Sequence, residues 1–158
     1  MTATLSDLHT CLKEEIRLMG EFLAALEDEA KVLEEGAAEA ALADTTARKN
    51  TLADTLAEQA ARRNALLGAL GCEPDAGGLR AAAELDPSLA GPRQQLLDTT
   101  TRAQALNEAN GRIIEVFLDH NQRTLETLRR LTGVGDIYDA SGRKHSGNKG
   151  SSRNIKAG

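Results

Sequence analysis

Residues 5–33 read LSDLHTCLKEEIRLMGEFLAALEDEAKVL, and the spacing of their apolar side chains sets the fold class. These side chains recur at steps of three and four, at Leu5, Leu8, Leu12, Ile16, Met19, Leu23, Leu26, Ala30 and Leu33. Such heptad spacing is typical of a helix that packs along a seam on another helix. Thr4 or Ser6 is a suitable N-cap and Gly36 is a suitable stop. The pattern therefore predicts one long amphipathic helix over residues 4–35.

Two further long helices are predicted downstream. Residues 37–70 continue the pattern, with a seam at Leu42, Lys49, Leu52, Leu56, Ala60, Arg63, Leu66 or Leu67, and Leu70. Only Gly36 and a few small residues separate the first two helices, so we expect them to form an antiparallel hairpin. Residues 71–91 are rich in Gly and Pro and are predicted to be a loop, with room for two helical turns over residues 79–85. Pro92 is suited to open a third helix over residues 92–132.

These elements predict an all-α fold, with a long antiparallel helical hairpin plus a third long helix in an elongated, coiled-coil-like three-helix bundle. Aromatic residues make up only 2% of the chain, as expected when Leu and Ala form the seams. We assign the helical domain to residues 1–135. Residues 136–158 are rich in Ser, Gly, Asn and Lys, and we expect a flexible, disordered tail there because such a composition buries too little apolar surface.

The charge pattern excludes several classes of partner. The net charge is −5, and the acidic excess lies in the helical part, which repels phosphate backbones, so we expect no nucleic-acid partner. Asp7, Glu14 and Glu15 interrupt the region where a signal peptide needs an apolar run, and we expect no membrane insertion. Cys11 and Cys72 are far apart and are predicted to be reduced, structural thiols. We therefore predict a cytoplasmic protein.

The residues that carry chemistry do not form a recognisable catalytic pattern. His9, His120 and His145 lie far apart, and none has a second ligand-type residue at zinc spacing. Gly-rich phosphate-binding loops and nucleophile elbows are absent from the sequence. The paired glutamates at 14–15 and 34–35 are interpreted as solvated helix faces. We predict that the protein is not an enzyme and uses no cofactor or metal.

The second half of the third predicted helix has an unusually wide apolar face. Its apolar side chains cover an arc of roughly 200°, whereas a helix that packs on one partner needs about 100°. They are Ile113, Ile114, Val116, Phe117, Leu118, Leu125, Leu128 and Leu131. Two explanations stay open at this point. Either the helix lies in the groove of the hairpin and contacts both of its helices, or part of the arc is exposed and receives an amphipathic helix of another protein.

Two polar features also have two interpretations each. Asn107 and Asn110 lie one turn apart near the seam, where they either fix the register of the bundle or hydrogen-bond the backbone of a partner. Tyr138 is the only tyrosine and stands in the segment DIYDASGR, just past the helices. It either packs onto the bundle or belongs to a short linear docking motif, because tyrosine supplies a large contact area with little loss of rotamer freedom.

Several of these segments match a known family. Residues 106–114, LNEANGRII, followed by Asn121, Gln122 and Leu125, resemble the Asn-x-x-Asn-Gly helix of FlgN-type flagellar export chaperones. Residues 138–142, YDASG, are similar to the Tyr-x-x-x-Gly motif that follows this helix in the family. The hairpin is also similar, with Lys49 before Leu52 and Leu56, and Arg63 before Leu66 and Leu67. The resemblance covers nearly the whole chain up to Arg143.

The resemblance implies a type III flagellar export chaperone. Such a protein binds C-terminal segments of the hook–filament junction proteins FlgK and FlgL, keeps them unpolymerised and delivers them to the export gate. We expect the substrate contacts to come from the C-terminal helix, at Asn107, Asn110, Ile113, Ile114, Phe117, Leu118, Asn121, Leu125 and Leu128. The family's docking tyrosine, which contacts the export-gate protein FlhA, corresponds to Tyr138. The competing hypothesis is a structural coiled-coil or sequestering regulatory protein without an export role, which self-associates through the same arc.

Overall fold

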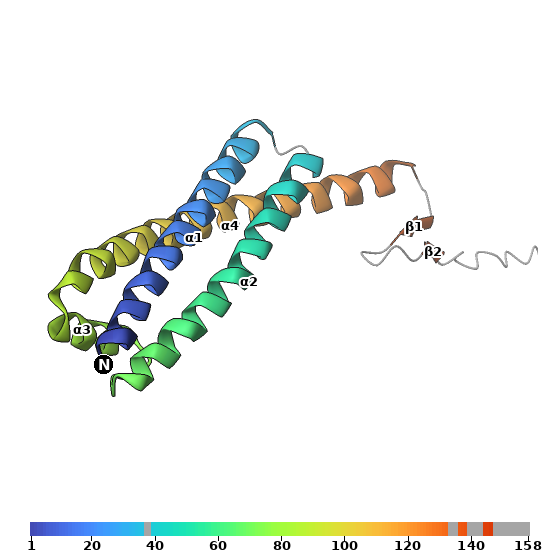
Figure 1. Ribbon diagram of the computed structural model, residues 1–158. Coiled ribbons are helices and arrows are strands. Elements are labelled where there is room, and N and C mark those ends of the chain that lie inside the picture. The colour runs from blue at the N-terminus through green and yellow to red at the C-terminus, as the bar shows by residue number, and fades with distance from the viewer. Residues whose placement is uncertain (37–38, 133–135, 139–143, 147–158) are drawn as a thin grey trace, which may run out of the picture. The chain divides into compact units, whose positions relative to one another are not determined.

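The computed structural model describes residues 1–36, 39–132, 136–138 and 144–146, and Figure 1 shows their arrangement. The elements are α1 (Thr2–Glu34), α2 (Glu39–Ala69), α3 (Ala76–Leu85), the 3-10 helix η1 (Pro87–Leu89), α4 (Ala90–Thr132), β1 (Asp136–Tyr138) and β2 (Lys144–Ser146). The predicted all-α fold, with a helical hairpin and a third long helix, is confirmed. The chain forms two compact units, Met1–Ile113 and Ile114–Gly158, with the boundary inside α4.

The core of the first unit is built around α1. One cluster of buried side chains joins all the helices of this unit, through Leu8, Leu12, Leu67, Leu79, Ala82, Leu89 and Leu96. A second cluster, formed by Leu23, Leu26 and Ala103, lies farther along α1 and α4. The predicted seam of α1 is buried at Leu8, Leu12, Leu23 and Leu26, and the buried face is wider than predicted because it also includes Cys11, Glu15, Leu18, Ala25 and Glu29. Within the first unit α1 therefore contacts α4, through these clusters and the hydrogen bond from Asn110 to Leu26, and it pairs with α2 in the hairpin (Figure 1).

The segment between the hairpin and α4 was predicted to be a loop with room for two helical turns over residues 79–85, and it is more helical than predicted. It contains α3 and η1. Asp75 caps α3, because its Oδ1 accepts a hydrogen bond from the Gly78 backbone N–H at 2.8 Å, and Leu79 and Ala82 bury the inner face of the helix. With only Leu79 and Ala82 as buried side chains, the apolar pattern is too short to define where the helix begins.

The start of α4 also differs from the prediction. Asp86 is extended, with φ −136° and ψ 99°, as expected for a residue before proline. Its carboxylate then accepts a hydrogen bond from the Ser88 backbone N–H and caps η1. Because η1 leads directly into α4, the long helix begins at Ala90 and Pro92 lies in its first turn. Proline is tolerated there because the first backbone N–H groups of a helix have no intrahelical partner.

The second unit contains the rest of α4 and a short antiparallel pair of strands. β1 pairs with β2 in the register Asp136 with Ser146, Ile137 with His145, and Tyr138 with Lys144. This pairing was not predicted from the sequence. Residues 139–143 and 147–158, which make up most of the predicted flexible tail, lie outside the described residues, so its disorder stays a prediction.

Candidate functional site

The second half of α4 exposes most of its apolar side chains. The exposed ones are Ile113, Val116, Leu118, Leu125, Leu128 and Leu131, with Leu131 78% and Val116 70% accessible. Among the described residues, the other exposed large hydrophobic side chains are Met1 and Leu85. Earlier in α4, by contrast, Leu96, Ala103 and Asn110 are buried. Of the two explanations for the wide arc, partial exposure therefore holds for these six side chains.

The other predicted contact residues on this half of α4 differ in how far their side chains are exposed. Ile114 and Phe117 are half-buried, and Asn121 is exposed. Arg123 forms an ion pair with Asp119 at 3.1 Å, one turn away in the charged sector of the helix. Both residues of this pair belong to the charged sector of the helix and not to the apolar face. The pair therefore places no charge on that face. A surface of this kind is typical of a site for another amphipathic helix.

Asn110 does not belong to the exposed face. Its side chain is 1% accessible, and its Nδ2 donates hydrogen bonds to the Leu26 carbonyl oxygen and to Glu29 Oε1, both at 3.0 Å. Both partners are in α1. Of the two interpretations of the asparagine pair, fixing the register therefore applies to Asn110, because its side chain is fully engaged inside the bundle.

Asn107 belongs to the same polar network but lies at its edge. Lys49 Nζ donates to both carboxylate oxygens of Glu29 at 3.2 Å and to Asn107 Oδ1 at 3.3 Å. Glu29 is fully buried, whereas Asn107 is exposed. A buried carboxylate is tolerated when a cation and hydrogen-bond donors compensate for its lost hydration. This network, which we call the Glu29 layer, links α1, α2 and α4 at one level.

A second polar layer repeats the arrangement within the hairpin. Glu15 is buried and forms an ion pair with Arg63. Glu15 and Glu29 are 14 residues apart in α1, as are Lys49 and Arg63 in α2, so the two ion pairs are two heptads apart. Burial raises the pKa of the Glu15 carboxyl, and the nearby Arg63 guanidinium opposes this shift. Two such layers fix the register of the hairpin, because slipping the helices would leave buried charges unpaired.

The interpretation of Glu15 as a solvated residue was therefore wrong, and the role of Glu29 was missed. The signal was present in the sequence, since Lys49 and Arg63 both occupy predicted seam positions in α2. A basic residue on a buried seam requires an acidic partner on the facing helix. Two heptads separate the basic pair, and three acidic pairs in α1 have the same separation, namely Asp7 with Glu21, Glu14 with Asp28, and Glu15 with Glu29. The spacing therefore narrows the partners to three pairs, and the structure identifies Glu15 and Glu29 as the buried one.

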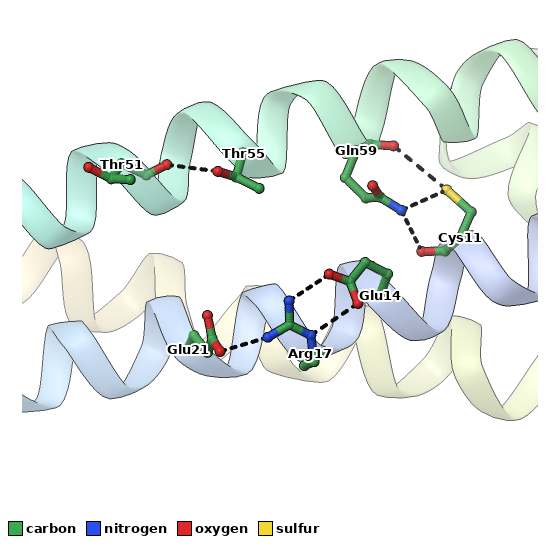
Figure 2. Close-up of polar contacts among 7 residues, drawn as sticks. All are labelled: Cys11, Glu14, Arg17, Glu21, Thr51, Thr55 and Gln59. Carbon is green, nitrogen blue, oxygen red and sulfur yellow. Dashed lines mark hydrogen bonds and ion pairs between the residues drawn. The ribbon is translucent and has the colours of Figure 1, made fainter.

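Several other polar side chains of the hairpin have structural partners, some of which Figure 2 shows. Gln59 Nε2 donates to the Cys11 carbonyl oxygen at 3.2 Å and so links α2 to α1. Burial is the main cause that raises the pKa of the Cys11 thiol, which favours its protonated, unreactive form. On the outer face of α1, Arg17 bridges Glu14 and Glu21. These contacts stabilise the helices and their pairing.

The described part of the chain contains neither a metal-binding cluster nor a membrane-spanning helix. Its His, Cys, Asp and Glu residues form no group of three or more that is placed to hold a metal ion. None of the described helices has both the length and the apolar character required to cross a membrane. Tyr138, the predicted docking residue, is the last residue of β1.

Comparison with known proteins places the chain in a family. No curated protein and no solved structure is significantly similar to it. The family model described as FlgN protein matches residues 1–146, from the start of α1 to the end of β2. The match includes the Asn-Gly segment of α4 and the segment that contains Tyr138. The chain therefore belongs to the FlgN family.

Proposed function

We propose that this protein is a cytoplasmic flagellar export chaperone for the hook–filament junction proteins FlgK and FlgL. It binds their C-terminal segments, keeps them unpolymerised and delivers them to the export gate, where Tyr138 contacts FlhA. Membership of the FlgN family supports a role as a flagellar export chaperone in general terms. The observation that carries the specific proposal is the exposed, uncharged apolar face on the second half of α4.

The physical basis is burial of apolar surface that both partners otherwise expose to water. Each Å² of apolar surface removed from water contributes about 25 cal/mol to binding before the costs of association. A client segment that is disordered before binding must also be ordered, and this cost reduces the net affinity. Binding of this kind protects the client segment and still permits its release. It requires neither catalysis nor a cofactor.

The client-binding residues that we propose differ from the predicted set in one respect. They are Asn107, Ile113, Ile114, Phe117, Leu118, Asn121, Leu125 and Leu128, all on α4. Asn110 is excluded because its side chain is buried and bonded to α1. Its contribution to binding is indirect, since it holds α4 in register with the hairpin.

The proposal is tested by calorimetry with synthetic peptides of the FlgK and FlgL C-terminal segments. Leu125→Asp and Leu128→Asp place a charge on the exposed face, and each is expected to weaken peptide binding at least tenfold, or about 1.4 kcal/mol. Both positions are exposed, so the circular dichroism spectrum and the unfolding midpoint should remain those of the wild type.

The matched control is Gln122→Asp, which adds the same charge at an exposed position about 120° away from Leu128 around the helix. It should bind the peptides as the wild type does. Equal affinities for all three variants would contradict α4 as the binding face. A wild-type chain that binds neither peptide and self-associates through α4 would instead support the competing structural role.

A further inference from the structure

A cavity of about 300 Å³ lies within the first unit, where α1, α2, α3 and α4 meet. Its walls are mostly apolar and are formed by Glu15, Met19, Arg63, Asp75, Ala76, Leu79, Leu96, Leu97 and Thr100. Glu15, Leu79 and Leu96 are buried, whereas Asp75 and Ala76 are exposed, so the cavity opens to solvent at the start of α3. A volume of this size is at the lower end of the range for small-molecule sites.

Glu15 brings an unpaired hydrogen-bond acceptor to this cavity. Its side chain is 5% accessible, and its Oε1 forms the ion pair with Arg63. The other carboxylate oxygen, Oε2, is also buried and has no hydrogen-bond partner among the described residues. A carboxylate accepts hydrogen bonds at both oxygens, and leaving one of them buried without a donor costs free energy. A group that enters the cavity and donates a hydrogen bond to Oε2 recovers this cost.

The polar groups that line the cavity favour a positively charged donor. Glu15 and Asp75 supply two carboxylates, whereas Arg63 supplies one cation, which is already bonded to Glu15. Thr100 adds a hydroxyl group, which also accepts hydrogen bonds. A hydroxyl ligand donates one hydrogen bond, whereas a primary ammonium group donates three and balances the excess negative charge. The side chain of Met19 and the leucines complete the lining and suit a short alkyl chain.

We propose that this cavity binds a primary alkylammonium group, with the ammonium bonded to Glu15 Oε2 and the alkyl chain against Met19, Leu79 and Leu96. The group belongs either to a lysine side chain of another protein segment or to a small free amine. A lysine suits the site because its aliphatic stem packs on apolar surface while its ammonium keeps polar partners. None of the cavity residues is among the proposed client-binding residues of α4, so the site and the proposed function stand or fall separately.

The test is an NMR titration of the full chain, labelled with carbon-13 at its methionine methyl groups. The chain has two methionines, of which Met19 lines the cavity, whereas Met1 is 74% accessible and does not. The probe is n-butylamine, which is protonated at neutral pH. It should shift the Met19 signal with a Kd on the order of 1 mM, within the limit for so small a molecule, and leave the Met1 signal in place. A titration without a saturable shift at Met19 would overturn the proposal.

Three further probes test the chemistry of the ligand. The alcohol n-butanol has the same alkyl chain without a charge, and butyrate has the opposite charge, so both should bind at least about tenfold more weakly than n-butylamine. If n-butanol binds as tightly as n-butylamine, the cavity selects alkyl chains alone and the proposal fails. The N-methylamide of Nα-acetyl-lysine distinguishes the two sources. Saturation of Met19 by this probe assigns the site to a lysine side chain, whereas binding of n-butylamine alone assigns it to a small free amine.

Glu15→Gln removes the charge with little change in size, and it should weaken n-butylamine binding at least about tenfold. Glu14→Gln is the matched control, because it removes the same charge from the exposed partner of Arg17 on the outer face of α1 (Figure 2). It should bind the amine as the wild type does, and equal affinities for the two variants would contradict the role of Glu15.

A variant that leaves every charge in place covers the case in which Glu15→Gln alters the fold. Ala76 is exposed at the opening of the cavity, so Ala76→Phe should block entry with little effect on the unfolding midpoint. The shift of the Met19 signal should then be lost. Wild-type amine binding by this variant would show that the probe binds elsewhere, and would overturn the proposal.

Discussion

Gly78 packs so closely against the backbone before α3 that a side chain at this position would clash with it. An alanine Cβ would lie 1.7 Å from the Glu73 carbonyl oxygen, and backbone atoms cannot move aside as a flexible side chain does. We expect Gly78→Ala to lower the free energy of unfolding by about 3 kcal/mol. Gly20→Ala, at an open position in α1, should raise it by about 1 kcal/mol. Urea unfolding of both variants checks the prediction, and similar effects would contradict it.

Glu15 gives the bundle a pH dependence whose sign follows from its burial. Burial raises the pKa of this carboxyl in the folded state above its value in the unfolded chain, despite the opposing effect of Arg63. Between these two pKa values the folded state binds more protons, so stability falls as the pH rises. We therefore expect the wild type to lose stability relative to Glu15→Gln between pH 4.5 and pH 7.5. Urea unfolding of both chains at the two pH values measures the difference.

Glu14 is the control, because its pKa is shifted in the opposite direction from that of Glu15. Its hydrogen bond to Arg17 lowers the pKa of the Glu14 carboxyl, so its contribution to stability is lost as the pH falls through the folded-state pKa. Relative to Glu14→Gln, the wild type should become less stable on acidification. A wild type that gains stability relative to Glu15→Gln as the pH rises would show that Arg63 outweighs burial at that site.

The Glu29 layer is the feature that joins α1, α2 and α4, and it can be tested through Lys49. Lys49→Met leaves the fully buried Glu29 carboxylate without its cation, which should cost about 3 kcal/mol of stability. The double variant Glu29→Met/Lys49→Met removes the charge as well and should recover more than half of this loss. Chemical unfolding of the two variants distinguishes a buried pair from a surface one. An effect of Lys49→Met below about 0.5 kcal/mol would be that of a surface ion pair.

The elements were predictable where the sequence keeps one period over many turns. The heptads of α1 and α2 placed both helices to within two residues at each described end, and the predicted third helix over residues 92–132 agrees with α4 to within two residues. α3 was predicted only in part, as two turns over residues 79–85, because the glycines at 77 and 78 hide its first turn. The sequence also left open whether the wide arc of α4 is buried, because burial depends on where neighbouring helices end and not on the period of the helix itself.

At the scale of the whole molecule, the buried core and the proposed client-binding face lie mostly in different parts of the chain. The buried clusters and both polar layers lie within residues 1–113, whereas most of the exposed apolar face lies beyond Ile113. The interpretation of Asn110 as a contact residue failed for this reason, since its side chain belongs to the core of the first unit. Sequence spacing places a residue on a helix face, but it does not determine whether another helix covers that face.

Tyr138 is tested separately from the helices, because it follows α4 in the sequence and is the last residue of β1. If Tyr138 is a docking residue, Tyr138→Ala should leave the melting temperature and the FlgK and FlgL peptide affinities nearly unchanged, within about ±0.5 kcal/mol. Loss of an aromatic anchor at an interface removes roughly 2 kcal/mol, so binding to FlhA should fall about 30-fold. Tyr138→Phe keeps the ring and should retain most of the FlhA affinity. Lower thermal stability of Tyr138→Ala with normal FlhA binding would instead show that the residue supports the fold.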